Sequence, residues 1–138
     1  MTGALLMREL YASDNLSSFL TRNTPLFYTH DTGTYLSGKL KEHGMSKASL
    51  ARSSGVNNIY LYQILSGARR PSRNIMICIG IGLSCSLNEI QEMFRKCSYA
   101  ELQVRCRRDS IIMFGIIHRE DVFTINDHLY KTGEEGLF

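Results

Sequence analysis

The chain has 138 residues, of which 43% are hydrophobic and 21% are charged, and its formal net charge is +3. This length suits one domain with a substantial core and some extensions. No run of about 18 apolar residues exists, so a membrane span is not expected. The first residues, MTGALLMREL, place no basic region before their short apolar stretch, which argues against a secretory signal. We therefore expect a folded, cytoplasmic protein.

Positive charge is concentrated in one part of the chain. Between Thr34 and Arg73 there are seven lysines and arginines and a single acidic residue, Glu42. That segment carries +6, whereas the remainder sums to −3. A local excess of this kind is what neutralisation of nucleic-acid phosphates requires.

The first 33 residues are predicted to form an N-terminal helical extension. Apolar residues recur at helical spacing on both sides of a break at residues 13–15; they are Leu5, Leu6, Leu10, Leu16, Phe19 and Leu20. Pro25 is expected to end this region, and residues 29–34 (THDTGT) are expected to form a turn-rich connection.

A helix is then predicted from about Tyr35 to His43, and a pair of short helices follows between residues 47 and 64. Ala51 is small enough to let two helices cross closely, and Gly55 can adopt the positive φ that ends a helix. Val56, Leu61 and Ile64 are spaced to pack the second helix back onto Leu50. This pattern predicts a helix-turn-helix, whose second helix can enter the DNA major groove.

Two further helices complete a predicted five-helix domain over residues 34–97. Pro71 suits the entry of the fourth helix, which carries one apolar stripe; its members are Ile75, Cys78, Ile79, Gly82 and Leu83. Ser86 and Glu89 form a capping-box pattern at the start of the fifth helix.

Residues 98–138 are predicted to form a C-terminal helical extension. An apolar stripe indicates a helix from Arg107 to His118, and Asp121 is a good N-cap for a last helix that ends at Gly133. No alternating apolar and polar run is long enough for a confident strand. The expected fold class is all-α.

The segment LKEHGMSKASLARSSGVNNIYLYQILSGARRPSRNIMICIGIGLSCSLNEI resembles the lambda-repressor-like (XRE, Cro/repressor type) helix-turn-helix domain of bacterial and phage regulators. The resemblance covers roughly residues 34–94 and includes the elements just described. Two features depart from the family pattern: Leu65-Ser66 before the Gly67 turn, and the apolar run Ile59 to Tyr62 in the second helix. The resemblance implies a five-helix bundle and a transcriptional regulator that binds double-stranded DNA.

In that family the exposed start of the second helix faces base edges. The corresponding residues here are Asn57, Asn58, Ile59, Tyr62 and Gln63. Asn and Gln amides can bond adenine, and Ile can touch a thymine methyl group. The alternative is that Asn57 and Asn58 serve only as caps, and that Tyr62, like Tyr60, packs against the protein.

Four basic residues are predicted to contact phosphates: Lys47, Arg69, Arg70 and Arg73. The alternative is a solvated basic loop. A second basic cluster (Arg105, Arg107 and Arg108) is expected to pair with Asp109, Glu101 or the acidic C-terminus instead.

The sequence gives little indication of catalysis or of a cofactor. It contains no nucleophile elbow, phosphate-binding loop, HExxH or EF-hand pattern, so an enzyme is not expected. The four cysteines form no C-x-x-C pair and have no histidine at zinc-site spacing, which predicts reduced, buried thiols and no metal; a metal or redox role is the alternative.

Two functions of different classes remain. The first is a DNA-binding regulator, expected to work as a homodimer through either terminal extension. The second is a protein-interaction module that uses Ile59, Tyr60 and Tyr62 to hold a protein partner.

Overall fold

The computed structural model describes residues 3–27 and 31–138. Over these ranges it contains nine α-helices, one short 3₁₀ helix and no strand, which confirms the predicted all-α class. No helix in the described ranges is long and apolar enough to cross a membrane.

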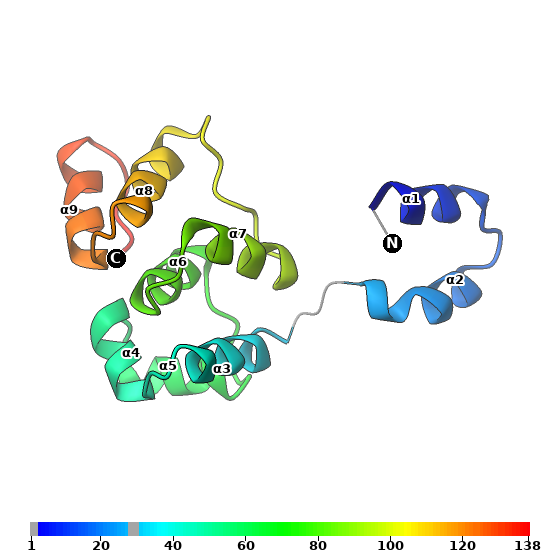
Figure 1. The fold of residues 1–138 in the computed structure, drawn as a ribbon, viewed down its shortest axis with the longest axis horizontal. Helices are drawn as coiled ribbons and strands as arrows, with labels where there is room; N and C mark the ends of the chain where they lie inside the picture. Colours follow the sequence, from blue (N-terminus) through cyan, green and yellow to red (C-terminus); the bar gives the residue numbers. More distant parts are fainter. Residues whose placement is uncertain (1–2, 28–30) are drawn as a thin grey trace.

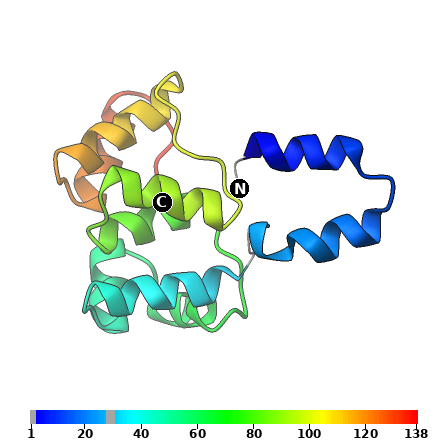
Figure 2. The ribbon, with the colours of Figure 1, turned by 45° about the vertical axis from the view of Figure 1, so that its right-hand side comes forward.

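The N-terminal hairpin consists of α1 (Gly3–Ala12), α2 (Leu16–Asn23) and the 3₁₀ helix η1 (Thr24–Leu26). The break falls where it was predicted because Asn15 caps α2, its side chain accepting the Ser18 N–H at 2.9 Å. An ion pair between Arg22 and Glu9 joins α2 to α1. In both ribbon views the hairpin lies apart from the other helices (Figures 1 and 2).

The remaining helices form three layers (Figures 1 and 2). The first layer contains α3 (Thr32–Glu42), α4 (Lys47–Ser54) and α5 (Asn58–Leu65). The middle layer contains α6 (Arg73–Gly82) and α7 (Leu87–Lys96), and the last contains α8 (Arg107–Ile117) and α9 (Val122–Lys131). Between these layers α4 packs on α6, and within them α3 packs on α5 and α8 on α9.

Two predicted helix starts were wrong by a few residues. Asp31 caps α3 by accepting the Thr34 N–H at 3.2 Å, so residues 32–34 are helical and not part of a turn; residues 29 and 30 lie outside the described residues. Helix α6 begins at Arg73 because Ser72 is its N-cap, which leaves Pro71 before the helix. The capping box at the start of α7 and the Asp121 cap of α9 are confirmed.

One apolar core runs through all three layers. Leu36 of α3, Ile64 of α5 and Phe94 of α7 are fully buried in it. Ile112 and Ile125 from the C-terminal helix pair belong to the same cluster. Residues 98–138 are therefore packed onto the bundle and bury apolar surface with it.

Close helix crossings depend on glycine at two positions. A Cβ at Gly33 would lie 2.8 Å from the Ile64 carbonyl oxygen of α5. A Cβ at Gly82 would lie 2.8 Å from the Ser54 amide nitrogen of α4, and the Ser53 hydroxyl donates to the Gly82 carbonyl at 2.8 Å. These contacts fix α3 and α6 tightly against the two helices of the predicted DNA-binding motif.

Candidate nucleic-acid-binding surface

Helices α4 and α5 form the predicted pair joined by a tight turn. Ser46 caps α4, and Gly55 ends it with φ of 73° while its N–H donates to the Ala51 carbonyl at 3.1 Å. Leu50 and Leu61 are fully buried between the two helices and the core. The sequence pattern therefore identified both the turn and the packed face of this pair.

The outer face of α5 is exposed and mixes amide and apolar side chains. Ile59 is 69% exposed and Tyr62 is 50% exposed, and Asn58 lies beside them on the surface. Gln63 is half-buried. Within the described ranges no group hydrogen-bonds to the side-chain amide of Asn58 or Gln63, so both amides are available to a ligand.

Two of the predicted residues have structural roles. The Asn57 side-chain oxygen accepts the N–H groups of Ile59 and Tyr60, at 2.9 and 3.3 Å, and so caps α5. Tyr60 is half-buried and packs against the core, as predicted. Asn57 thus positions the exposed residues of α5, whether or not it also touches a base.

Lys47 and Arg69 place positive charge beside α5. The Lys47 ammonium lies 5.0 Å from the centre of the Tyr62 ring, and the Arg69 guanidinium lies 5.8 Å from the centre of the Tyr60 ring. Neither forms an ion pair with a described residue. Since no Asp or Glu occurs between Glu42 and Glu89, the positive charge of α4, α5 and the following loop has no local acidic counterpart.

The other two arginines predicted to contact phosphates bond to the protein itself. Arg70 donates to the Thr32 hydroxyl at 3.2 Å and to the Cys97 carbonyl at 2.9 Å. Arg73 donates to both carboxylate oxygens of Asp109, at 3.2 and 3.0 Å, and to the Ala100 carbonyl at 2.9 Å. Their guanidinium groups tie the segment after α7 to the bundle, and phosphate contact by either stays a prediction.

The second basic cluster largely pairs with the C-terminus, as expected. Arg107 forms an ion pair with Glu134 at 2.6 Å, and Arg108 donates to the Glu135 and Gly136 carbonyls. The expected partner Asp109 pairs with Arg73 instead.

The cysteine prediction was correct for three thiols and wrong for one. All four thiols are free, and three of them are buried. Cys106 is exposed, because it is the N-cap residue of α8, at the surface end of that helix.

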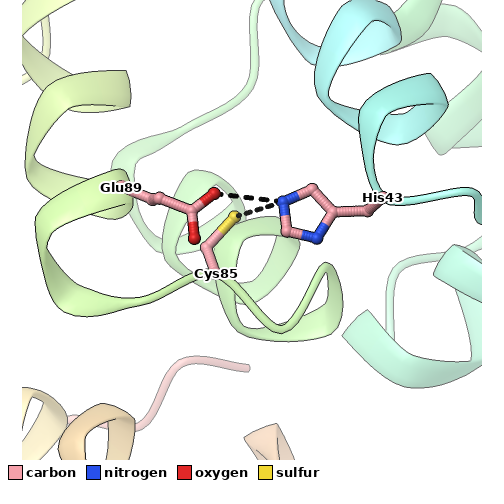
Figure 3. A group of neighbouring side chains, drawn as sticks. All are labelled: His43, Cys85 and Glu89. Atoms are coloured by element: carbon pink, nitrogen blue, oxygen red, sulfur yellow. Dashed lines mark hydrogen bonds and ion pairs between the residues drawn. The ribbon is translucent and has the colours of Figure 1, made fainter.

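The structure also brings together three potential metal ligands that the sequence pattern did not reveal. His43, Cys85 and Glu89 present a nitrogen, a sulfur and an oxygen atom that all lie within 4.8 Å of one another (Figure 3). Inspection for short metal-binding spacings could not find this cluster, because His43 precedes Cys85 by 42 residues.

Comparisons of the chain with protein-family models, with curated proteins and with solved structures found no match.

Proposed function

We propose that the protein is a sequence-specific DNA-binding regulator that inserts α5 into the major groove. The observation that carries this proposal is the outer face of α5: the amides of Asn58 and Gln63 have no hydrogen-bond partner among the described residues, and Lys47 and Arg69 lie against Tyr62 and Tyr60 of the same helix, in a segment without acidic residues. Helix α5 follows a tight turn from α4, as the recognition helix does in a helix-turn-helix.

The predicted contact residues of α5 each have a suitable partner on DNA. The amides of Asn58 and Gln63 can each donate to and accept from an adenine edge, and Ile59 can contact a thymine methyl group. Tyr62 can donate its hydroxyl to a phosphate beside Lys47. Phosphate contacts fix the register of the helix, so Lys47 and Arg69 would position these base-reading side chains.

A single module of this kind buries only roughly 600–1,000 Å² of protein surface on DNA. We therefore expect two copies to act together on half-sites about one helical turn apart. The N-terminal hairpin is a candidate for holding the two copies together, since many of its apolar side chains are exposed.

Selection of bound fragments from random duplex DNA tests the proposal and measures half-site spacing. On the selected site, Arg69→Ala is expected to weaken binding of all sequences alike and to reduce the salt slope by about one. Gln63→Ala is expected to cost about 1–3 kcal/mol and to relax preference at one base pair. Arg105→Ala is the matched control, because Arg105 is exposed but lies outside this surface.

A protein-interaction module is the second candidate, and the exposure of Ile59 and Tyr62 favours it. Apolar side chains gathered on a surface often mark protein contacts. The two candidates differ in salt dependence, because phosphate neutralisation makes DNA affinity fall steeply with salt. If the purified protein selects no DNA and shows no salt-sensitive association with duplexes, the DNA-binding proposal is wrong.

A further inference from the structure

We propose that His43, Cys85 and Glu89 bind a divalent transition-metal ion of the zinc class. The proposal does not depend on DNA binding. Nitrogen, thiolate and carboxylate donors are the ligands that zinc uses in proteins.

The three ligands come from three different segments (Figure 3). His43 ends α3, Cys85 lies in the short connection between α6 and α7, and Glu89 lies in the first turn of α7. His43 Nε2 lies 3.1 Å from Glu89 Oε2 and 3.9 Å from Cys85 Sγ. Zinc–ligand bonds of about 2.0–2.3 Å separate the donor atoms of a tetrahedral site by about 3.3–3.6 Å. These two separations bracket the tetrahedral values, and the third pair of donor atoms, from Cys85 and Glu89, lies within 4.8 Å, so side-chain shifts would have to draw the three ligands together.

The surroundings hold the Glu89 carboxylate in place. Its Oε1 atom accepts the Ser86 N–H at 3.1 Å in the capping box, which leaves Oε2 directed at His43. Outer hydrogen bonds of this kind orient metal ligands. The His43 and Glu89 side chains are 22% and 32% exposed, so the cluster has a solvent side from which an ion can enter and where water can supply a fourth ligand.

Charge near the cluster is compatible with a cation. Lys39 Nζ lies 3.6 Å from Glu89 Oε2, and it lies equally close to a carboxylate oxygen of Glu42. An incoming metal ion can therefore take Glu89 while Lys39 keeps its Glu42 partner.

Metal binding must release one proton. Burial, together with the nearby carboxylates of Glu89 and Glu42, raises the pKa of the Cys85 thiol to about 12, although Lys39 and Arg119 act to lower it. The thiol is therefore protonated at neutral pH without metal. Binding replaces the S–H bond by a sulfur–zinc bond and passes the proton to solvent, so affinity falls as the pH falls.

A metal ion at this position would join α3 to the α6–α7 connection. Binding to the folded state alone stabilises it, which raises Tm as metal is added. The proposal thus assigns a structural role to the site: it fixes the helix that packs against α5.

Cobalt(II) is the probe, because cobalt bound to a thiolate absorbs light where the free ion does not. The full chain is purified with a phosphine reductant, stripped with a chelator and titrated with Co²⁺. We expect a thiolate-to-cobalt charge-transfer band and tetrahedral d–d bands that saturate at one equivalent. One equivalent of Zn²⁺ should bleach them, and Zn²⁺ should raise Tm. Absence of the thiolate band in the unmutated protein overturns the proposal, whatever the variants do.

Variants identify the ligands. Cys85→Ser should abolish the charge-transfer band and the Zn²⁺-dependent rise in Tm. His43→Gln should weaken Zn²⁺ binding by at least about tenfold, since even outer-shell losses cost about 10–100-fold. Cys106→Ser is the control, because Cys106 is the one exposed thiol of the chain. A band that survives Cys85→Ser and disappears in Cys106→Ser would place the metal at the surface thiol and refute the site. Circular dichroism checks that each variant is folded.

Discussion

Asp109 is only 4% exposed and yet is ionised, because its neighbours donate the hydrogen bonds that water would otherwise donate to its carboxylate. Arg73 donates to both of its oxygens, and the Gln103 N–H donates to Oδ2 at 2.9 Å. Burial opposes ionisation, but these hydrogen bonds and the charge of Arg73 outweigh it and hold the pKa of Asp109 below its ordinary value. Removing the charge would leave the Arg73 guanidinium without an acidic partner among the described residues.

Asp109→Asn is expected to destabilise the protein by about 3 kcal/mol at neutral pH, as breaking a buried ion pair does. The folded-state pKa is depressed, so this contribution is complete above the unfolded-state value of about 3.9 and is lost as the pH falls through the folded-state value. Urea unfolding of both proteins between neutral pH and pH 3 measures the difference. It should be constant at neutral pH and shrink only below about pH 4.

Asp127→Asn is the control for this comparison. Asp127 pairs with Lys131 one turn away, but both side chains are more than half exposed, so the change should cost less than about 0.5 kcal/mol. A difference between the unmutated protein and Asp109→Asn that increases on acidification would contradict the assigned role of the Arg73–Asp109 pair.

Side-chain pairs whose members lie far apart in the sequence could not be predicted from it. Arg73 follows a glycine-containing loop in a basic segment, which predicted a phosphate contact, but its partner Asp109 lies 36 residues away. His43 and Cys85 are further apart still. Partners separated by this much sequence leave no local periodicity, and only the packing of α3, α6 and α8 brings them together.

For the helices, the caps and turns could largely be predicted because they depend on residues that are close in sequence. Asn57, Ser86 and Asp121 each accept N–H groups within three residues of their own position; the Ser86 and Asp121 caps were predicted, and capping by Asn57 was the stated alternative to a base contact. The close helix crossings could not be predicted as well, because a glycine in a helix does not show which other helix packs against it.

Variants of the neighbours Asn57 and Asn58 distinguish a residue that caps α5 from an exposed residue that is free to contact DNA. Asn57→Ala should destabilise the protein by about 0.5–2 kcal/mol, since two N–H groups of α5 lose their acceptor. Asn58→Ala should leave stability within about 0.5 kcal/mol, because this exposed side chain has no partner within the described ranges. Urea unfolding measures both. Equal stability losses would show that Asn58 also holds the helix.

Gly82→Ala tests the crossing of α4 and α6. Its Cβ would meet the Ser54 backbone at 2.8 Å, so the helices must separate, at a cost of about 1–3 kcal/mol. Gly38→Ala in α3 is the matched control, because its Cβ would meet no atom within 4 Å. It should stabilise the helix by about 0.5–1 kcal/mol. Thermal unfolding of the two variants should shift Tm in opposite directions; a shared direction would refute the crossing.

The N-terminal hairpin exposes apolar side chains away from the basic α4–α5 region. The basic α4–α5 region belongs to the three-layer bundle, whereas the hairpin of α1 and α2 lies apart from it and exposes Leu10, Tyr11, Leu16 and Leu20. The hairpin carries two basic and two acidic residues, so two copies would meet without net repulsion. Pairing of hairpins would leave both α5 surfaces free for adjacent half-sites, which is why we propose this element as the contact of the expected dimer.

The double variant Leu16→Asp/Leu20→Asp tests this assignment. If apolar contacts between hairpins hold two copies together, the unmutated protein should sediment as a dimer and the variant as a monomer, because four charges would have to be buried at the interface. Ser17→Asp/Thr21→Asp is the matched control: it adds the same charge to exposed positions of the same helix and should stay dimeric. Helical content by circular dichroism should be the same in all three proteins. A variant that stays dimeric would exclude the hairpin as the dimer contact and leave the C-terminal helix pair as the alternative, whereas a monomeric unmutated protein would refute the dimer itself.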